Sequence, residues 1–155
     1  MVRWRYDDPP LVWLLVGAYA AHLVEELVGG FPNWLGTVIG RPLAGRDFLI
    51  INAVGVGAMI VAAYLSATRA TLRWLAVGMA TVLLVNGLLH LAGSLATGTY
   101  SPGLITGIVL YVPLGQLVLL RASDQAPRAF VWRGVLAGLA AHAAVTLTAF
   151  GAAYR

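Results

Sequence analysis

Long apolar stretches separated by short polar breaks run through the whole chain. A helix rises about 1.5 Å per residue, so about 20 mostly apolar residues are needed to cross a membrane. Five stretches reach this length, at about residues 10–28, 47–68, 72–96, 103–120 and 129–153. The pattern predicts an all-α fold, a polytopic membrane helix bundle with five transmembrane helices. We expect residues 1–155 to form a single integral membrane domain, because no polar linker divides them.

Glycine and proline mark the breaks between these stretches. Gly29, Gly30 and Pro32 end the first stretch, because both residue types interrupt helices. The following residues 31–39 are too few to cross a membrane, and their aromatic side chains indicate a position at the membrane interface. Pro113 lies inside the fourth stretch and predicts a kink there.

The composition agrees with a membrane protein. Of the 155 residues, 60% are hydrophobic and 10% are charged, whereas a soluble domain carries about 25% charged residues. All ten basic residues are arginines, and they lie near the ends of apolar stretches rather than on one face. We therefore expect contacts with membrane lipids and no binding of nucleic acid. The absence of cysteine excludes disulfides, thiolate metal ligands and cysteine nucleophiles.

The distribution of arginine also predicts an orientation. With five helices, about seven arginines fall on the side of the N-terminus and about three on the opposite side. The positive-inside rule then places the N-terminus in the cytoplasm and the C-terminus outside, in the cell (inner) membrane. The first stretch resembles a signal peptide, but Asp7 and Asp8 precede it, and we expect it to remain as a signal anchor.

Ionisable residues interrupt the first apolar stretch. His22, Glu25 and Glu26 lie within it, where a charged side chain costs roughly 2.5–3.5 kcal/mol and is usually kept for a function. Their spacing puts both acids one helical turn from the histidine. His90 reaches the same outer half of the membrane, because the two histidines lie roughly 18 and 27 Å along helices that rise from one side. These four residues are the expected catalytic centre, and also the expected ligands if a metal is bound.

Other polar residues complete the expected site. Those expected to bind substrate are Asn52, Asn86, Tyr100, Tyr111 and Arg46. Two adjacent acids repel each other unless a proton, a metal ion or an arginine compensates them, and Arg46 is a candidate for that role. Together with Arg41, it is also expected to contact an anionic head group. His142 lies on a polar stripe of the fifth stretch, and its membership of the site stays open.

Three short motifs occur in a fixed order along the chain. They are His22-Leu23-Val24-Glu25-Glu26, the histidine His90, and Tyr100-Ser101-Pro102-Gly103. With these motifs the chain resembles the HXXEE family of small integral membrane proteins, over about the first 120 residues. That family is one of unknown function, so the resemblance implies a site around these motifs and no particular activity.

Two chemistries fit histidines beside carboxylates in an apolar surrounding. The first is metal-free acid–base catalysis, in which a glutamate and a histidine exchange a proton with the substrate. The second uses a divalent metal, Zn or Fe, whose open positions take water or substrate. Haem held between two histidines is a weaker candidate, because it leaves the acids without a role. We expect an enzyme that isomerises, cyclises or hydrolyses a lipophilic, isoprenoid- or lipid-like molecule.

Two other classes of function are alternatives. They are a proton or metal-ion transporter and an accessory subunit of a larger membrane complex. The polar residues gather in one half of the membrane with no polar trail to the cytoplasm, which favours a pocket over a conduit. Small-residue patterns at Gly103-x-x-x-Gly107 and Gly134-x-x-x-Gly138 allow helices to approach closely, within a bundle or in an oligomer.

Overall fold

The computed structural model describes residues 5–155, and helices are its only regular secondary structure over that range. In chain order these are α1 (Pro9–Gly29), α2 (Phe31–Ile39), α3 (Gly45–Thr68), the short 3₁₀-helix η1 (Ala70–Leu72), α4 (Trp74–Thr97), α5 (Leu104–Thr106), the π-helix η2 (Gly107–Tyr111), α6 (Val112–Gln125) and α7 (Arg128–Ala153). The segments α5, η2 and α6 follow one another directly and form one long helix. Five helices are therefore long and apolar enough to cross a membrane, which confirms the predicted fold class.

The predicted and observed helix ends agree closely except in the fourth long helix. This helix continues beyond residue 120 to Gln125, because polar residues there do not interrupt helical hydrogen bonding. Pro127 is the first residue that cannot continue the helix, and Ala126 before it is extended. At the other break, Gly30 adopts a left-handed conformation with φ of 74°, which ends α1 and lets α2 begin at once.

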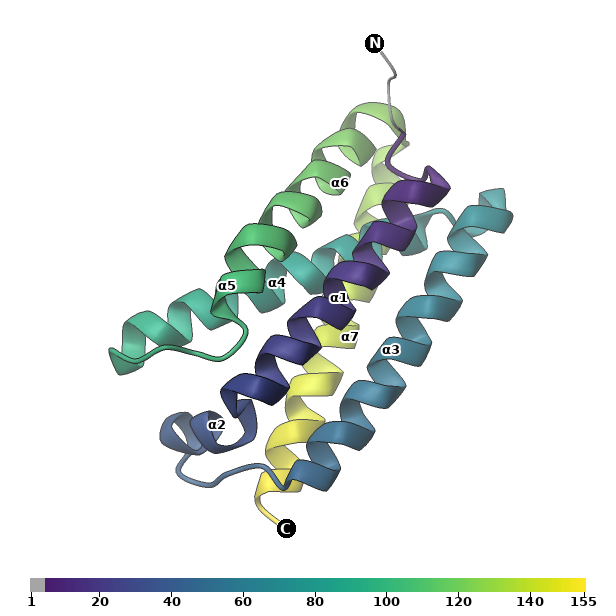
Figure 1. Ribbon diagram of the computed structural model, residues 1–155. Coiled ribbons are helices and arrows are strands. Elements are labelled where there is room, and N and C mark those ends of the chain that lie inside the picture. Colours follow the sequence, from purple (N-terminus) through teal and green to yellow (C-terminus); the bar gives the residue numbers. More distant parts are fainter. Residues whose placement is uncertain (1–4) are drawn as a thin grey trace.

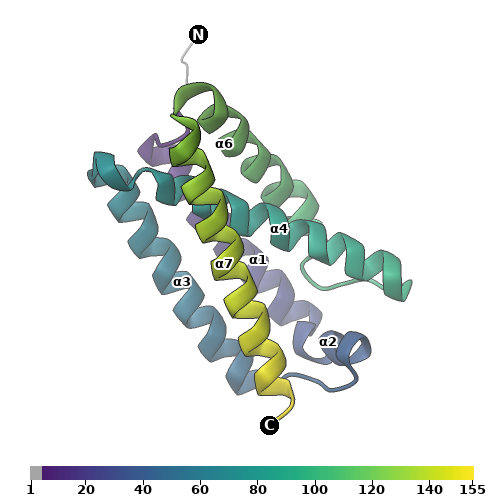
Figure 2. The ribbon, with the colours of Figure 1, turned by 180° about the vertical axis from the view of Figure 1, so that it is seen from behind.

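The central element of the bundle is α4. Figures 1 and 2 show α1, α3 and α7 running along the length of the molecule, while α4 crosses them at a steep angle. It contacts α1, α3, α6 and α7, and it is the most buried of the five long helices. Side chains on α4 therefore face several other helices, which is the setting that a shared polar site requires.

Glycines allow α4 to approach its neighbours closely. A Cβ atom on Gly138 of α7 would lie 2.5 Å from the carbonyl oxygen of Gly78, and a Cβ atom on Gly107 would lie 3.2 Å from the Cα atom of Gly87. Both small-residue patterns noted in the sequence therefore contribute glycines to contacts inside the chain.

The disturbance expected at Pro113 takes the form of a π-helical turn. The wide turn η2 directly precedes the segment that contains Pro113, whose missing N–H leaves a carbonyl one turn earlier without its usual donor. Such turns recur at functional sites because they rotate the side chains that follow. Tyr111 at the end of η2 is only 1% exposed and lies against the histidine of α1.

Candidate functional site

The structure brings three of the expected residues into one buried cluster. His22 and Glu26 lie on the same face of α1, and α4 carries His90 toward them; all three side chains are buried. The Oε1 atom of Glu26 is 3.5 Å from Nε2 of His22 and 3.3 Å from Nε2 of His90. The two imidazole rings meet edge to face, with centroids 4.8 Å apart. We refer to His22, Glu26 and His90 as the His/Glu centre.

Hydroxyl groups hold the second nitrogen of both imidazoles. Nδ1 of His22 is 2.8 Å from Oγ1 of Thr106, and Nδ1 of His90 is 2.9 Å from Oγ of Ser101. These contacts fix the two rings so that both Nε2 atoms are directed at Glu26. Ser101 belongs to the 100–103 motif that the sequence marks, whereas Thr106 lies outside the three motifs.

The neighbouring acid, Glu25, has a different position. Its carboxylate accepts hydrogen bonds from the backbone N–H groups of Gly103, Ile105 and Thr106 at 3.1, 2.9 and 2.7 Å. It also accepts from the hydroxyl groups of Thr106, at 2.5 Å, and Tyr100. A carboxylate at this place neutralises the positive end of the fourth long helix. Both oxygens of Glu25 are occupied, and the structure does not bring it into the His/Glu centre.

Tyr100 lies between the third and fourth long helices and donates its hydroxyl proton to Glu25. Burial and this hydrogen bond raise the pKa of Tyr100 to about 12. The phenol therefore stays protonated throughout the physiological pH range. It remains a hydrogen-bond donor to Glu25 in that range.

The remaining residues of the 100–103 loop also contact α1 or α4. Ser101 bonds His90, and a Cβ atom on Gly29 would lie 2.7 Å from the Cβ atom of Pro102. A Cβ atom on Gly103 would lie 2.6 and 2.7 Å from Cε1 of His90 and His22, so only glycine fits against the two rings. The 100–103 loop and the residues 22–26 of α1 thus pack together as one unit.

Replacing Glu25 with glutamine should destabilise this unit. The variant loses the negative charge that several N–H and O–H groups share, and each hydrogen bond to a charged group contributes about 1.5–3 kcal/mol. We expect the free energy of unfolding to fall by at least about 2 kcal/mol, measured by thermal unfolding in detergent. Asp47→Asn, which alters an acid near the start of α3, is the control. An unchanged melting temperature in Glu25→Gln would contradict the assigned role.

The hydrogen bonds around Thr106 also determine which nitrogen of His22 carries a proton. Thr106 has one hydroxyl proton, and it donates that proton to the carboxylate of Glu25, which can only accept. The Thr106 oxygen must then accept from Nδ1–H of His22. In a neutral imidazole this leaves Nε2 as an acceptor facing Oε1 of Glu26, a second acceptor. A proton on either atom, or a metal ion bound by both, would make their approach favourable.

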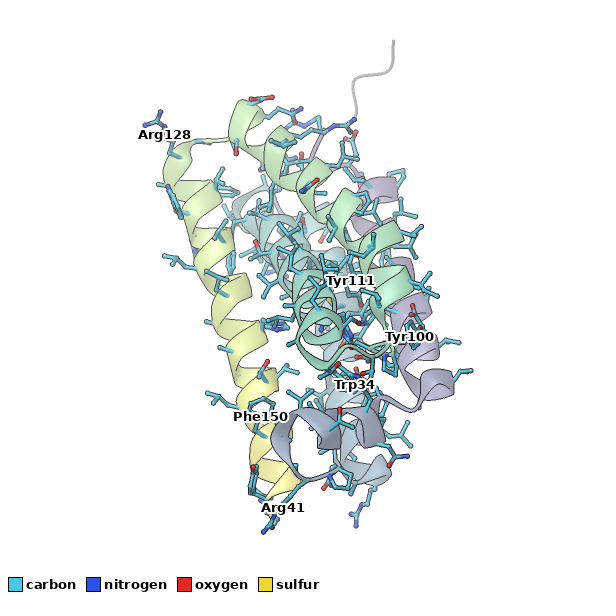
Figure 3. All side chains as sticks on the ribbon, turned by 90° about the vertical axis from the view of Figure 1, so that its left-hand side faces the viewer. Trp34, Arg41, Tyr100, Tyr111, Arg128 and Phe150 are labelled. Carbon is cyan, nitrogen blue, oxygen red and sulfur yellow. The ribbon has the colours of Figure 1, made fainter. Side chains whose placement is uncertain are left out.

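Aromatic side chains surround the centre. Tyr111 stacks on the His22 ring with centroids 4.2 Å apart, and Phe31 and Trp34 of α2 lie 5.3 and 6.5 Å from the His90 ring. Trp34 also donates a hydrogen bond to Thr99 at 3.1 Å, which connects α2 to the loop after α4. Figure 3 shows Tyr111 inside the bundle, with Trp34 and Tyr100 nearer the α2 end. Apolar rings thus exclude solvent from much of the centre.

Three of the residues expected to bind substrate line a cavity beside His22 and Glu26. They are Asn52, Asn86 and Tyr111, and His142 lines the same cavity. Asn52 accepts a hydrogen bond from the hydroxyl of Tyr19 at 3.3 Å.

Arg46, expected to compensate the acids, and Arg41, expected at a head group, have other surroundings. Arg46 is exposed, and the ion pairs that residues 5–155 make with Glu26 come from His22 and His90 instead. Arg41 lies over the Tyr154 ring at 5.2 Å, near the C-terminus. The charge compensation near the acids therefore uses imidazoles, hydroxyls and backbone N–H groups rather than arginine.

The five long apolar helices indicate an integral membrane protein. Within it, α1 and α4 form a buried histidine–glutamate centre, which the 100–103 loop supports. The chain belongs to the HXXEE family, described as proteins of unknown function with the HXXEE motif, and the match covers residues 13–118. This confirms the family expected from the motifs. His142 lies beyond the matched residues. No curated protein and no solved structure matches the chain.

Proposed function

We propose that this protein is a membrane-embedded enzyme whose His/Glu centre binds a divalent metal ion, Zn²⁺ or Fe²⁺, and acts on a lipid-like molecule. The observation that carries the proposal is the chain of hydrogen bonds from Glu25 through Thr106 to His22. It leaves Nε2 of His22 without a hydrogen-bond partner among the described residues, although Oε1 of Glu26 is 3.5 Å away. A metal ion bound by both atoms satisfies them together.

The distances from Glu26 to each histidine fit such an ion. Metal bonds of about 2.0–2.2 Å at tetrahedral angles place two ligand atoms about 3.3–3.6 Å apart. The distances from Glu26 to the two histidines are 3.5 and 3.3 Å, and the three candidate ligand atoms all lie within 4.8 Å of one another. Two imidazoles and one carboxylate are the protein ligands of several catalytic zinc sites and of non-haem Fe(II) oxygenases.

The surroundings of the centre also resemble those of a metal site. Histidines that bind metals usually donate their second N–H to a nearby oxygen, which fixes the ring and its tautomer. His22 and His90 have such partners in Thr106 and Ser101. A bound metal would polarise a substrate oxygen or lower the pKa of a bound water. The protein would supply the ligands, the orientation of the rings and a cavity that admits the substrate.

The proposed location follows from the position of the centre and from arginine distribution. Thr106 and Ser101 lie close to the start of the fourth long helix, and α2 and the C-terminus lie toward the same end of the molecule (Figure 1). If the positive-inside rule holds, the N-terminus is cytoplasmic and this end is outside. We therefore propose that the chemistry takes place in the outer half of the cell membrane.

A second candidate is metal-free acid–base catalysis. The 3.3 Å between Glu26 and Nε2 of His90 is within hydrogen-bond range, so a proton can join this pair. Glu26 and a protonated imidazole would then exchange that proton with the substrate. We favour the metal over this alternative because Nε2 of His22, 3.5 Å from Glu26, makes no hydrogen bond with it.

Elemental analysis of protein purified without chelators distinguishes the two chemistries. We expect about one Zn or Fe ion per chain in the wild type and a loss of nearly all of it in His22→Ala, because a ligand is removed. His142→Ala is the matched control, since this histidine lies outside the cluster and should retain the metal. The metal centre would be contradicted if the wild type contained no metal, or if His22→Ala retained as much metal as His142→Ala.

A further inference from the structure

Two cavities in the bundle share one wall. The first adjoins His22 and Glu26 and has a volume of about 120 Å³, and the second lies among α3, α4 and α7 and has a volume of about 200 Å³. The residues that line both are Tyr19, Asn86, Tyr111, His142 and Val145. A buried apolar cavity of about 150 Å³ is enough to hold a small hydrocarbon ring, so the second cavity can take part of a lipid chain.

The shared wall contains three polar atoms without partners. They are Oδ1 of Asn86, the hydroxyl oxygen of Tyr111 and Nε2 of His142, all buried and without a hydrogen bond to the described residues. An unsatisfied buried polar group costs about 1–3 kcal/mol, and native proteins usually satisfy it with water or a ligand. Three such atoms on one wall indicate that a polar group binds between the two cavities.

The charges of the lining indicate the kind of polar group. Neither cavity is lined by an arginine in the range that the structure describes, and the second is lined by apolar side chains such as Met59, Ala62 and Met79. Glu26 is the charged residue of the first cavity. Among the side chains that line the two cavities, an anionic head group would have no positively charged partner, and it would pay a large desolvation cost. An uncharged oxygen, in contrast, needs only the three neutral polar atoms.

We infer that Asn86, Tyr111 and His142 bind the hydroxyl or carbonyl oxygen of an uncharged, elongated lipid whose chain occupies the cavity among α3, α4 and α7. This inference rests on the proposed function, since the same ligand extends toward Glu26 and is the molecule on which the centre acts. It assigns His142 to ligand binding rather than to the cluster around Glu26. It also separates head-group recognition from Arg41 and Arg46.

The first test compares probes that differ only in their head group. Binding of 1-hexadecanol, palmitate and hexadecyl phosphate to the purified protein is followed by the change in tryptophan fluorescence, since Trp74, one of five tryptophans, lines the second cavity. In protein from which a chelator has removed any metal ion, we expect the alcohol to bind at least about tenfold more tightly than either anion, because the wall has no positively charged side chain. Equal or tighter binding of the anions would overturn the inference.

The second test removes one polar atom while keeping the ring that stacks on His22. Tyr111→Phe should weaken hexadecanol binding about tenfold, the effect of losing one hydrogen bond in a buried site. Tyr64→Phe is the matched control, because that tyrosine is 59% exposed on α3 and lines neither cavity. Unchanged binding in Tyr111→Phe would overturn the inference.

The third test fills the space assigned to the lipid chain. Ala62→Phe places a ring in the second cavity and should change the preference from hexadecanol to a shorter alcohol such as decanol. Ala53→Phe, on an exposed position of the same helix, should leave the preference unchanged and shows that α3 tolerates phenylalanine. The same chain-length preference in Ala62→Phe and the wild type would overturn the placement of the chain.

Metal content is measured in every sample so that the two proposals fail separately. Hexadecanol binding by protein without metal would support this inference while overturning the metal centre. Metal-loaded protein that does not bind the alcohol would overturn this inference alone.

Discussion

Replacing Gly103 with alanine should separate the two histidines and abolish metal binding. The added Cβ atom would meet Cε1 of His90 at 2.6 Å and of His22 at 2.7 Å, and neither ring can withdraw without losing its hydroxyl partner. The backbone at Gly103 also has φ of 104°, which costs a non-glycine residue about 1–3 kcal/mol. Overpacking adds about 1–3 kcal/mol more. Metal content and thermal unfolding, both in detergent, measure these effects.

Gly98→Ala is the control that separates the two causes. Gly98 also has a positive φ, 65°, but its added Cβ atom would have nothing within 4 Å. We expect this variant to lose some stability and to keep its metal. If Gly103→Ala and Gly98→Ala bind the same amount of metal, the contact of the 100–103 loop with the histidines does not control the centre.

Replacing Glu26 with glutamine should produce the second large effect. Glutamine has nearly the same shape, but it removes the negative charge that both Nε2 atoms face at 3.5 and 3.3 Å. Mutation of a residue that only hydrogen-bonds a metal ligand typically lowers metal affinity 10–100-fold. Because Glu26 is itself a proposed ligand, we expect its replacement to lower metal affinity more than about 100-fold. Competition with a chelator of known affinity measures the change.

The adjacent acid supplies the comparison for that experiment. Glu25→Gln removes the same charge one residue earlier, from a carboxylate that caps the fourth long helix. Its folded fraction should still bind metal, with a smaller loss that reflects a displaced Thr106. A larger loss of metal in Glu25→Gln than in Glu26→Gln would reverse the assigned roles.

The fold could be predicted from the sequence because its signal is long and simple. Each membrane-crossing helix is a continuous apolar stretch, and glycine and proline mark most of the ends. Polarity predicts an end of the fourth long helix at residue 120, but the helix continues to Gln125 and ends before Pro127. The π-helical turn η2 was not foreseen in form, since Pro113 indicates a disturbance without specifying how the backbone relieves it.

The candidate site could be predicted in part. Helical rise and the predicted topology placed His22 and His90 in the same half of the membrane, and the structure has their rings in contact. The different partners of Glu25 and Glu26 could not be derived from the sequence. Both acids lie one turn from His22, and the rotation of α1 decides which of them faces His90. Hydroxyl partners such as Thr106 were missed for a related reason. They depend on the path of the 100–103 loop, which no periodicity encodes.

The most direct test of the His/Glu centre is X-ray absorption spectroscopy of the metal in protein purified without chelators. We expect the spectrum to show two imidazole nitrogens and one or more oxygens at about 2.0–2.2 Å from the metal, with no sulfur ligand. In His90→Ala the residual metal should show one imidazole fewer, and in His142→Ala the spectrum should match the wild type. A metal without imidazole ligands, or an imidazole number unchanged in His90→Ala, would contradict a centre formed by His22, Glu26 and His90.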